Sequence, residues 1–344
     1  MRTTYGRYVL LVGLSLVLMG CGGGGSSEDD ATVSSTSSSA TSVSSSSAAS
    51  STASSSSSSS ATESATTDTS AVSCGIGASE YNSDTSVKLT ATYSWTCSGS
   101  YRLLSANGVP NHSVGTFPNT NNPNTISAQT VAAQFTLAPT KLSSLTEVTH
   151  VVGFAINGVK FDPATAAVCD DSGSDCVMDS SMSSDPGTWE IEALSQTYFN
   201  LGLDDNNAHV QPDGSYHYHG MPEGLITKLG GSSSTMTLIG WAMDGFPIYA
   251  RYGYSDAMDA SSALVVLTSS YQTKDTPDDN RPSTSLYAMG TFAQDWEYVE
   301  GLGDLDECNG RYGVTPEFPD GTYYYVTTDT WPYVQRCVMG TPTT

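Results

Sequence analysis

Three of the chain's five histidines, His209, His217 and His219, fall within eleven residues of one another. Pro212-Asp213-Gly214 separates the first from the other two, and this composition predicts a three-residue hairpin loop built on a type I turn. In that register His209 faces His217 across two antiparallel strands, and strand alternation places His219 on the same face. Three neutral imidazoles on one rigid face predict a transition-metal site, with zinc or copper expected first.

Two other interpretations of these histidines remain open. A His-x-His pair on a strand is also found on ordinary solvated or hydrogen-bonded surfaces. A histidine can also act as a general base without a metal, because its pKa lies near neutral pH. A change of one residue in loop length would turn His209 to the opposite face, so the metal prediction depends on the register.

Carboxylates beside predicted turns are candidates for additional metal ligands. Asp244 follows the apolar run 238–243 and precedes Gly245, which places it at the end of a predicted strand. An Asp-Gly pair is equally typical of a plain turn. Asp204 and Asp205, shortly before His209, are second choices.

A separate acidic cluster is formed by Asp304, Asp306 and Glu307. Its oxygen atoms are compatible with calcium, but the cluster lacks the alternating ligand pattern ending in Glu that marks a calcium loop. A solvated turn is the competing interpretation.

The elements that must position these groups are predicted to be mainly strands, in a β-rich, sandwich-like or barrel-like single domain with one or two short helices. Asn157-Gly158 lies between two apolar stretches and predicts a hairpin. The predicted helices are residues 188–199 and residues 222–229, the second closed by Gly230-Gly231. Short apolar runs rich in aromatic or β-branched residues predict strands at 91–95, 148–156, 236–243 and 322–327.

The first 73 residues predict export rather than a fold. Residues 1–20 contain Arg2, Arg7 and a short apolar run, the layout of a signal peptide. The run ends at Cys21 in a sequence that resembles the lipobox of bacterial lipoproteins, which implies lipidation of Cys21, with ordinary secretion as the alternative. Residues 21–73 are then a lipidated cysteine and a Ser-rich disordered linker, with 24 serines between residues 22 and 73. Gly22 after the cysteine implies an outer-membrane lipoprotein of the bacterial cell envelope.

The remaining six cysteines lie in the predicted domain, residues 74–344. An even number of cysteines in an exported domain predicts disulfides, although the sequence alone does not determine the pairing. We expect sequential pairing, and we regard thiolate metal ligation as a weaker alternative because no C-x-x-C spacing is present. The disulfide candidates are Cys74, Cys97, Cys169, Cys176, Cys308 and Cys337.

The charge balance excludes one class of partner. The chain has 35 acidic and 12 basic residues, a formal net charge of −23. Such a chain repels phosphate backbones, and no basic cluster provides a local exception, so we expect no nucleic-acid partner. Membrane contact is expected through the lipid anchor alone.

The sequence resembles a known family, the YHYH domain proteins, which are named for the motif present here as Tyr216-His217-Tyr218-His219. The resemblance extends over about residues 148–340 and implies an exported domain in which His217 and His219 are central. The motifs that support it are residues 153–159, 215–220, 240–249, 305–313 and 316–323.

Together these observations predict a surface-tethered lipoprotein that binds a transition metal through the histidine hairpin. If the protein is an enzyme, an open coordination position would serve hydrolysis or oxidation, and the sequence assigns no catalytic residue. The alternatives are a non-enzymatic binding or adhesion module for glycan or protein, suggested by the 19 tyrosines and 5 tryptophans, and a purely structural role for the histidines. The substrate or ligand is not identified.

Overall fold

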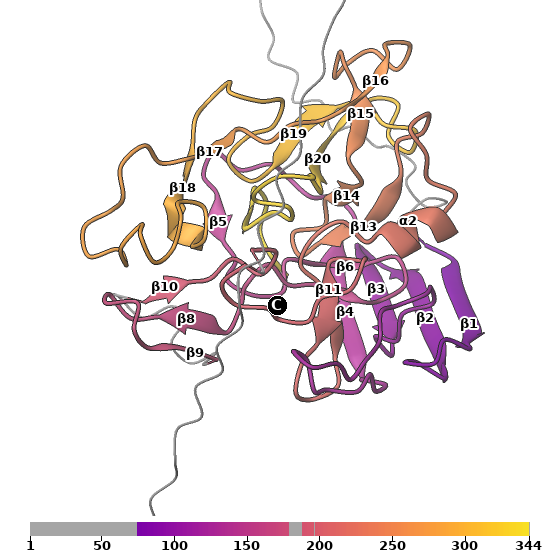
Figure 1. Ribbon diagram of the computed structural model, residues 1–344. Helices are drawn as coiled ribbons and strands as arrows, with labels where there is room; N and C mark the ends of the chain where they lie inside the picture. The colour runs from indigo at the N-terminus through magenta and orange to yellow at the C-terminus, as the bar shows by residue number, and fades with distance from the viewer. Residues whose placement is uncertain (1–73, 179–187, 196, 344) are drawn as a thin grey trace, which may run out of the picture. The chain divides into compact units, whose positions relative to one another are not determined.

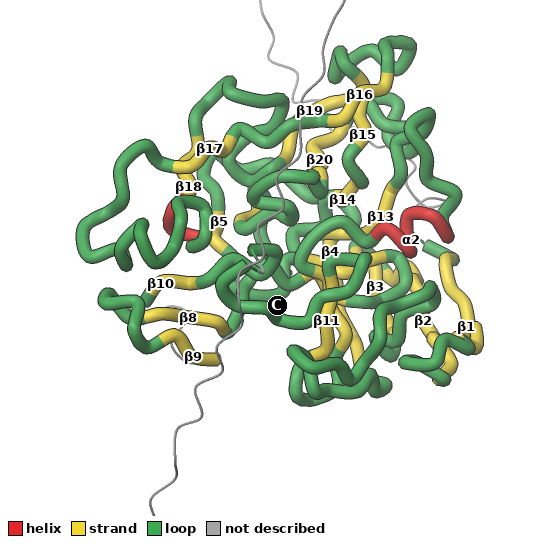
Figure 2. The backbone as a smooth tube through the Cα atoms, in the orientation of Figure 1, coloured by secondary structure: helices red, strands yellow, loops and turns green. Residues whose placement is uncertain are grey.

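The computed structural model describes residues 74–178, 188–195 and 197–343, all within one compact unit, Glu63–Thr344. The predicted signal peptide, Cys21 and linker lie outside the described residues. The described chain is mainly β, as predicted, and Figure 2 shows that loops nevertheless account for much of the backbone. None of the helices in the described residues has both the length and the apolar character needed to cross a membrane.

The largest element is an eight-stranded mixed sheet that curls into a half-barrel (Figure 1). Four of its strands come from two hairpins, β6–β7 and β11–β12, and these are joined where β12 pairs in parallel with β7. In spatial order the strands are β11 (Ala208–Val210), β12 (Tyr216–Tyr218), β7 (Lys160–Phe161), β6 (Gly153–Ala155), β13 (Leu238–Ala242), β14 (Pro247–Tyr249), β20 (Thr322–Val326) and β19 (Gly310–Gly313).

A four-stranded antiparallel meander precedes this sheet in the chain. It consists of β1 (Ile76–Asn82), β2 (Leu89–Ser98), β3 (Tyr101–Ala106) and β4 (Val131–Thr136). Trp95 and Phe135 from this meander share a buried cluster with Ile156 and Trp241, which belong to the region of the large sheet. The two sheets are therefore packed against one another through apolar side chains, the arrangement expected of a sandwich.

Shorter strand pairs complete the fold. They are β10 (Trp189–Glu190), β8 (Ala167–Cys169) and β9 (Cys176–Met178) in one sheet, and the pairs β15 (Tyr252–Tyr254) with β16 (Leu264–Val266), β17 (Tyr271–Thr273) with β18 (Trp296–Tyr298), and β5 (Thr146–Glu147) with β21 (Cys337–Val338). The sequential disulfide pairing is confirmed, with bridges Cys74–Cys97, Cys169–Cys176 and Cys308–Cys337.

One of the two predicted helices is wrong. Residues 222–229 contain α2 (Glu223–Lys228), as predicted, and a short 3-10 turn, η1 (Ala293–Asp295), was not predicted. The described part of residues 188–199 instead begins with β10, in which Trp189 pairs with Cys169, and continues with a bridge from Ile191 to Phe292. Trp189 and Ile191 are buried and Glu190 between them is half-buried, an alternation expected of a strand.

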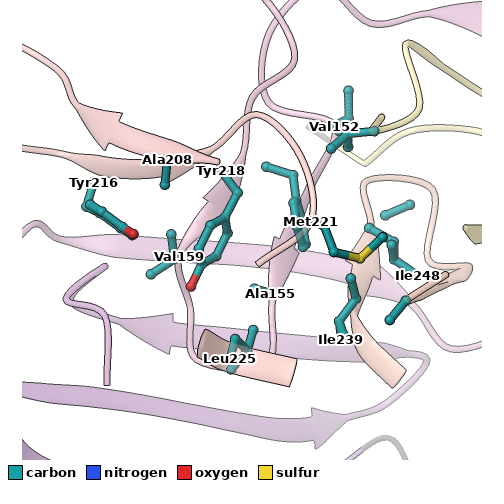
Figure 3. Packing of buried hydrophobic residues seen from close by; sticks show 14 of the residues in the cluster. Val152, Ala155, Val159, Ala208, Tyr216, Tyr218, Met221, Leu225, Ile239 and Ile248 are labelled. Atoms are coloured by element: carbon teal, nitrogen blue, oxygen red, sulfur yellow. The ribbon is translucent and has the colours of Figure 1, made fainter. Parts of the chain in front are cut away.

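The hairpin predicted at Asn157-Gly158 is confirmed as β6–β7, with Gly158 at a φ of +79° that suits glycine. The predicted strand at 91–95 lies within β2, and the predicted strands at 236–243 and 322–327 contain β13 and β20. Only Gly153–Ala155 of the run 148–156 is in a strand of the large sheet. The main core lies on one face of this sheet, and Figure 3 shows Tyr218 packed there beside Val159, with Leu225 of α2 below it and Tyr216 near Ala208.

Candidate metal centre

The histidine hairpin has the predicted register. In β11–β12, His209 is the partner of His217, and Val210 is the partner of Tyr216. The amide of Gln211 donates to the carbonyl of Ser215 at 2.9 Å, and the amide of Gly214 donates to the carbonyl of Gln211 at 2.9 Å. Gly214 has a φ of +87°, the left-handed position that closes such a loop.

The two faces of the hairpin have different chemistry. Val210, Tyr216 and Tyr218 belong to the main apolar core. Because successive side chains of a strand alternate, the histidines are left on the opposite face, where His209, His217 and His219 come together. All three are nevertheless buried, with exposed fractions of 8%, 1% and 2%.

The three imidazoles form a compact triangle. Their ring centroids lie 4.7 Å (His209 to His217), 4.9 Å (His209 to His219) and 4.6 Å (His217 to His219) apart. One potential ligand atom from each residue lies within 4.8 Å of the other two. Nε2 of His209 and Nε2 of His219 are 3.2 Å apart. Two nitrogens bound to one tetrahedral ion at about 2.0–2.1 Å are separated by about 3.3–3.4 Å, so this spacing fits a shared metal.

The other ring nitrogens determine which atoms face the triangle. Nδ1 of His209 lies 2.9 Å from the carbonyl of Leu201, to which it donates, so that Nε2 retains its lone pair. Nδ1 of His217 lies 3.4 Å from the carbonyl of Ser215. Nδ1 of His219 is buried and makes no hydrogen bond within the described residues. His209 thus has the backbone hydrogen bond that commonly orients a metal-binding imidazole.

Burial keeps these imidazoles neutral, which is the form that binds metals. Burial lowers the pKa of His217 and of His219 well below the usual range, and the neighbouring His209 lowers both further. Burial also lowers the pKa of His209, against the opposing effects of the Leu201 carbonyl and of the nearby charge of Asp162.

Two charged neighbours of the triangle were missed by the sequence analysis. Lys160 of β7 is the parallel partner of His217, and the amide of Asp162 donates to the carbonyl of Tyr218 at 2.9 Å, so Asp162 runs alongside His219. Lys160 Nζ lies 3.3 Å from Asp162 Oδ2, whereas Asp162 Oδ1 is buried without a hydrogen-bond partner. In the sequence these two residues flank Phe161, but that position alone does not relate them to the histidines. The parallel pairing of β7 with β12 places them beside the histidine hairpin.

A polar network supports the hairpin from the core side. The hydroxyl of Tyr218 lies 2.6 Å from Nε2 of His112 and accepts a hydrogen bond from Nδ2 of Asn157 at 3.1 Å. Nδ1 of His112 lies 2.9 Å from the carbonyl of Ser113. His112 therefore supports the core face of the hairpin through its contact with Tyr218, and it is not one of the three clustered histidines.

The histidine triangle opens onto a cavity of about 880 Å³. Its lining combines uncharged polar residues, among them Asn122, Asn124 and Gln211, with apolar residues such as Phe199. Asp213 is the one acidic residue in this lining. The volume lies within the range of small-molecule sites in proteins.

Asp244 does not belong to this centre. Within the described residues, the group that could share one ion comprises the three histidines alone. The buried carboxylate of Asp244 accepts hydrogen bonds from the hydroxyl of Tyr325 at 2.6 Å and from the amides of Gly340 at 2.8 Å and Phe246 at 3.2 Å. Burial raises its pKa. Asp244 is thus used as an internal acceptor that ties the end of β13 to the C-terminal segment.

The second-choice carboxylates are also engaged elsewhere. Asp204 accepts from the hydroxyl of Tyr216 at 2.7 Å and from the amide of Gly115 at 2.9 Å, and Asp205 is exposed. In the acidic cluster proposed for calcium, Asp304 accepts from Thr268 and Asp306 accepts from Tyr323 and from backbone amides. These contacts correspond to the turn interpretation of that cluster.

The model of the family described as YHYH protein matches residues 132–340, which begins within β4 and includes every strand of the eight-stranded sheet. No significant match to the chain is found among curated proteins or among solved structures.

Proposed function

Because the chain belongs to the YHYH protein family, we propose that the motif after which the family is named binds a transition-metal ion, through His217 and His219 together with His209. The decisive observation is the convergence of three buried imidazoles with their nitrogen atoms within 4.8 Å of one another. A solvated His-x-His surface pair would have neither this burial nor a third imidazole.

The charge of Asp162 favours a cation beside His209, whereas the charge of Lys160 opposes one at all three imidazoles. Asp162 has an exposed fraction of 4%, and its Oδ1 has no hydrogen-bond partner. A buried carboxylate is costly unless a positive charge compensates it, and Lys160 does so at one oxygen only. A metal ion bound to the three imidazoles would compensate the remaining negative charge of the Asp162 carboxylate. Zinc and copper are the ions that best suit a set of imidazole nitrogens.

Three protein ligands leave a coordination position open, which is the pattern of catalytic rather than purely structural metal sites. A metal bound here would supply Lewis-acid or redox chemistry to a molecule in the adjoining cavity. A lining that combines uncharged polar and apolar side chains favours a neutral substrate. We therefore propose a metal-dependent hydrolase or oxidase.

Metal analysis of the full chain tests this proposal. After reconstitution with Zn²⁺ or Cu²⁺ and removal of excess ion, we expect about one metal per chain by elemental analysis. The double variant H217A/H219A is expected to retain none. The matched control is His150→Ala, because His150 is exposed and does not belong to the triangle. Stoichiometric metal in H217A/H219A, or none in the reconstituted wild type, would overturn the proposal.

The location of the protein is a second part of the proposal. The apolar run before Cys21 and the Ser-rich segment after it support export and lipid anchoring at the outer membrane, with the domain tethered away from the lipid. Labelling of cells with radioactive palmitate is expected to mark the wild type and not the variant Cys21→Ser. Equal labelling of both, or of neither, would contradict the lipoprotein assignment.

The buried aromatic residues favour the metal proposal over an adhesion module. Surface platforms for glycans need exposed rings, but many of the rings are in the core. The largest fully buried side chains include Trp95, Trp241, Tyr216, Tyr218, Tyr249, Tyr323, Tyr324 and Tyr325.

A further inference from the structure

A groove of about 470 Å³ lies where β1, the end of α2 and the start of β13 meet. It shares no lining residue with the cavity of the histidine triangle. Glu317, from the sequence motif 316–323, lies in its wall, and Tyr249, from the motif 240–249, contacts this glutamate. Two motifs that the metal centre does not use therefore meet at this groove.

The groove is apolar and accessible from solvent. The apolar side chains that line it are Ile76, Ile156, Leu229, Met236 and Leu238. Leu229 has an exposed fraction of 39%, and Ile76 and Leu238 are only half-buried. A Cβ placed on Gly230 in the same lining would have no heavy atom within 4 Å, so this edge of the groove is open. An apolar ligand can therefore reach these side chains and cover surface that now faces water.

Glu317 is the one charged residue in this lining, and it is half-buried. The hydroxyl of Tyr249 donates to Oε2 of Glu317 at 2.6 Å, which orients the carboxylate without neutralising it. Within the described residues, no Lys, Arg or His side chain forms an ion pair with Glu317. Lys228, which precedes Leu229 in the chain, is paired with Glu80 at 2.7 Å. The groove thus presents a negative charge without a protein counter-ion.

This charge selects the class of ligand. Burial raises the pKa of Glu317, so its surroundings disfavour the ionised carboxylate, and a positive charge beside it would stabilise that form. A quaternary ammonium group is usually held by aromatic rings, and none lines this groove. A primary ammonium group fits better, because it donates hydrogen bonds to a carboxylate.

We propose that this groove is a second ligand site, which binds a small organic cation made of a primary ammonium group and an alkyl chain. The ammonium group donates to the carboxylate of Glu317, and the chain lies against the apolar wall that includes Leu229 and Leu238. The apolar wall selects against ammonium and metal ions, and the carboxylate selects against neutral and anionic amphiphiles. This site does not depend on the metal centre.

Titration of the full chain with hexylammonium at neutral pH, followed by calorimetry, tests the proposal. We expect saturable binding of one ligand with a Kd below about 1 mM, the scale accessible to a ligand of this size. 1-Hexanol, which has the same chain without the charge, and methylammonium, which has the charge without the chain, are each expected to bind at least about tenfold more weakly. Hexyltrimethylammonium, which has no N–H donor, should also bind more weakly. Equal binding of hexylammonium and 1-hexanol, or no saturable binding of hexylammonium, would overturn the proposal.

Three variants locate the site. Glu317→Gln retains the size of the side chain and an acceptor for Tyr249 but removes the charge, and it is expected to weaken hexylammonium binding at least about tenfold. Glu300→Gln is the matched control, because it removes the same charge from an exposed position outside the lining. It is expected to leave binding unchanged.

Leu229→Ala tests the apolar wall independently of the charge, at a position exposed enough for the substitution to be tolerated. It is expected to weaken hexylammonium binding severalfold through the loss of apolar contact. Equal losses in Glu317→Gln and Glu300→Gln would show that the net charge of the protein attracts the cation, and would contradict the assignment. Unchanged binding in Glu317→Gln or in Leu229→Ala would place the hexylammonium elsewhere and would overturn it as well.

Discussion

His209 lies directly opposite His217 in the β11–β12 hairpin, with their ring centroids 4.7 Å apart. This pairing fixes the chemistry of both faces, because the same register directs Tyr216 and Tyr218 into the core. The loop Pro212-Asp213-Gly214 therefore determines the geometry of the histidine triangle. Any change that alters the loop should affect stability and metal binding together.

We predict that Gly214→Ala destabilises the domain by at least about 2 kcal/mol, through a strained φ and overpacking. A Cβ at this position would collide with the side chain of Ser127. Gly230→Ala is the matched control, because Gly230 also has a positive φ, +77°, but has open space around it. Its cost should be only about 1 kcal/mol. Urea denaturation of both variants measures the difference, and equal losses would show that the contact with Ser127 is unimportant.

The hairpin could be predicted because its information is local. Pro212, Asp213 and Gly214 dictate the turn, and alternation then places the histidines. The positions of Lys160 and Asp162 could not be predicted in this way. They reach the triangle through the parallel pairing of β7 with β12, in which paired residues are 57 positions apart, and nothing local in the sequence specifies that pairing.

The two incorrect or unsupported expectations have similar causes. Residues 188–199 contain aromatic and apolar positions compatible with a helix, but pairing of Trp189 with Cys169 and of Ile191 with Phe292 imposes an extended backbone. Asp244 does lie at a strand end, as predicted, but its acceptors are used by Tyr325 and Gly340, which are 81 and 96 residues away. Tertiary partners decided both outcomes.

We predict that Asp162→Asn lowers the affinity for metal, because it removes a buried negative charge that acts on His209 and would favour a bound cation. The substitution removes the buried negative charge beside His209 and His219 but preserves the size of the side chain. Asp205→Asn is the control, because this substitution removes the same formal charge from an exposed position. Competition with a chelator of known affinity measures the change. An equal effect of both variants would mean that net charge, and not the position of Asp162, sets the affinity.

We predict that Asp244→Asn leaves the metal content unchanged but alters the pH dependence of stability. Burial raises the pKa of Asp244 in the folded protein above the unfolded value of about 3.9. Its favourable contribution is then present below the unfolded pKa and is lost as the pH rises through the folded pKa. Relative to the wild type, Asp244→Asn should therefore gain stability between pH 4 and pH 7, as measured by urea denaturation at each pH. Loss of metal from this variant would instead restore Asp244 as a ligand.

Finally, we predict that the three disulfides differ in their contribution to stability. Oxidised protein denatured in guanidinium should have one reactive thiol at most, at Cys21, because the other six cysteines are paired. Loop-closure entropy gives about 3.6 kcal/mol for a closed loop of 29 residues, the separation of Cys308 and Cys337, and about 2.4 kcal/mol for one of 7, that of Cys169 and Cys176. Cys308 and Cys337 are also buried in the main core, whereas Cys169 and Cys176 close a turn next to a smaller cluster. Thermal unfolding of C308A/C337A and C169A/C176A should therefore show the larger loss for the first pair. The reverse order would indicate that local constraint of the β8–β9 turn matters more than the long loop.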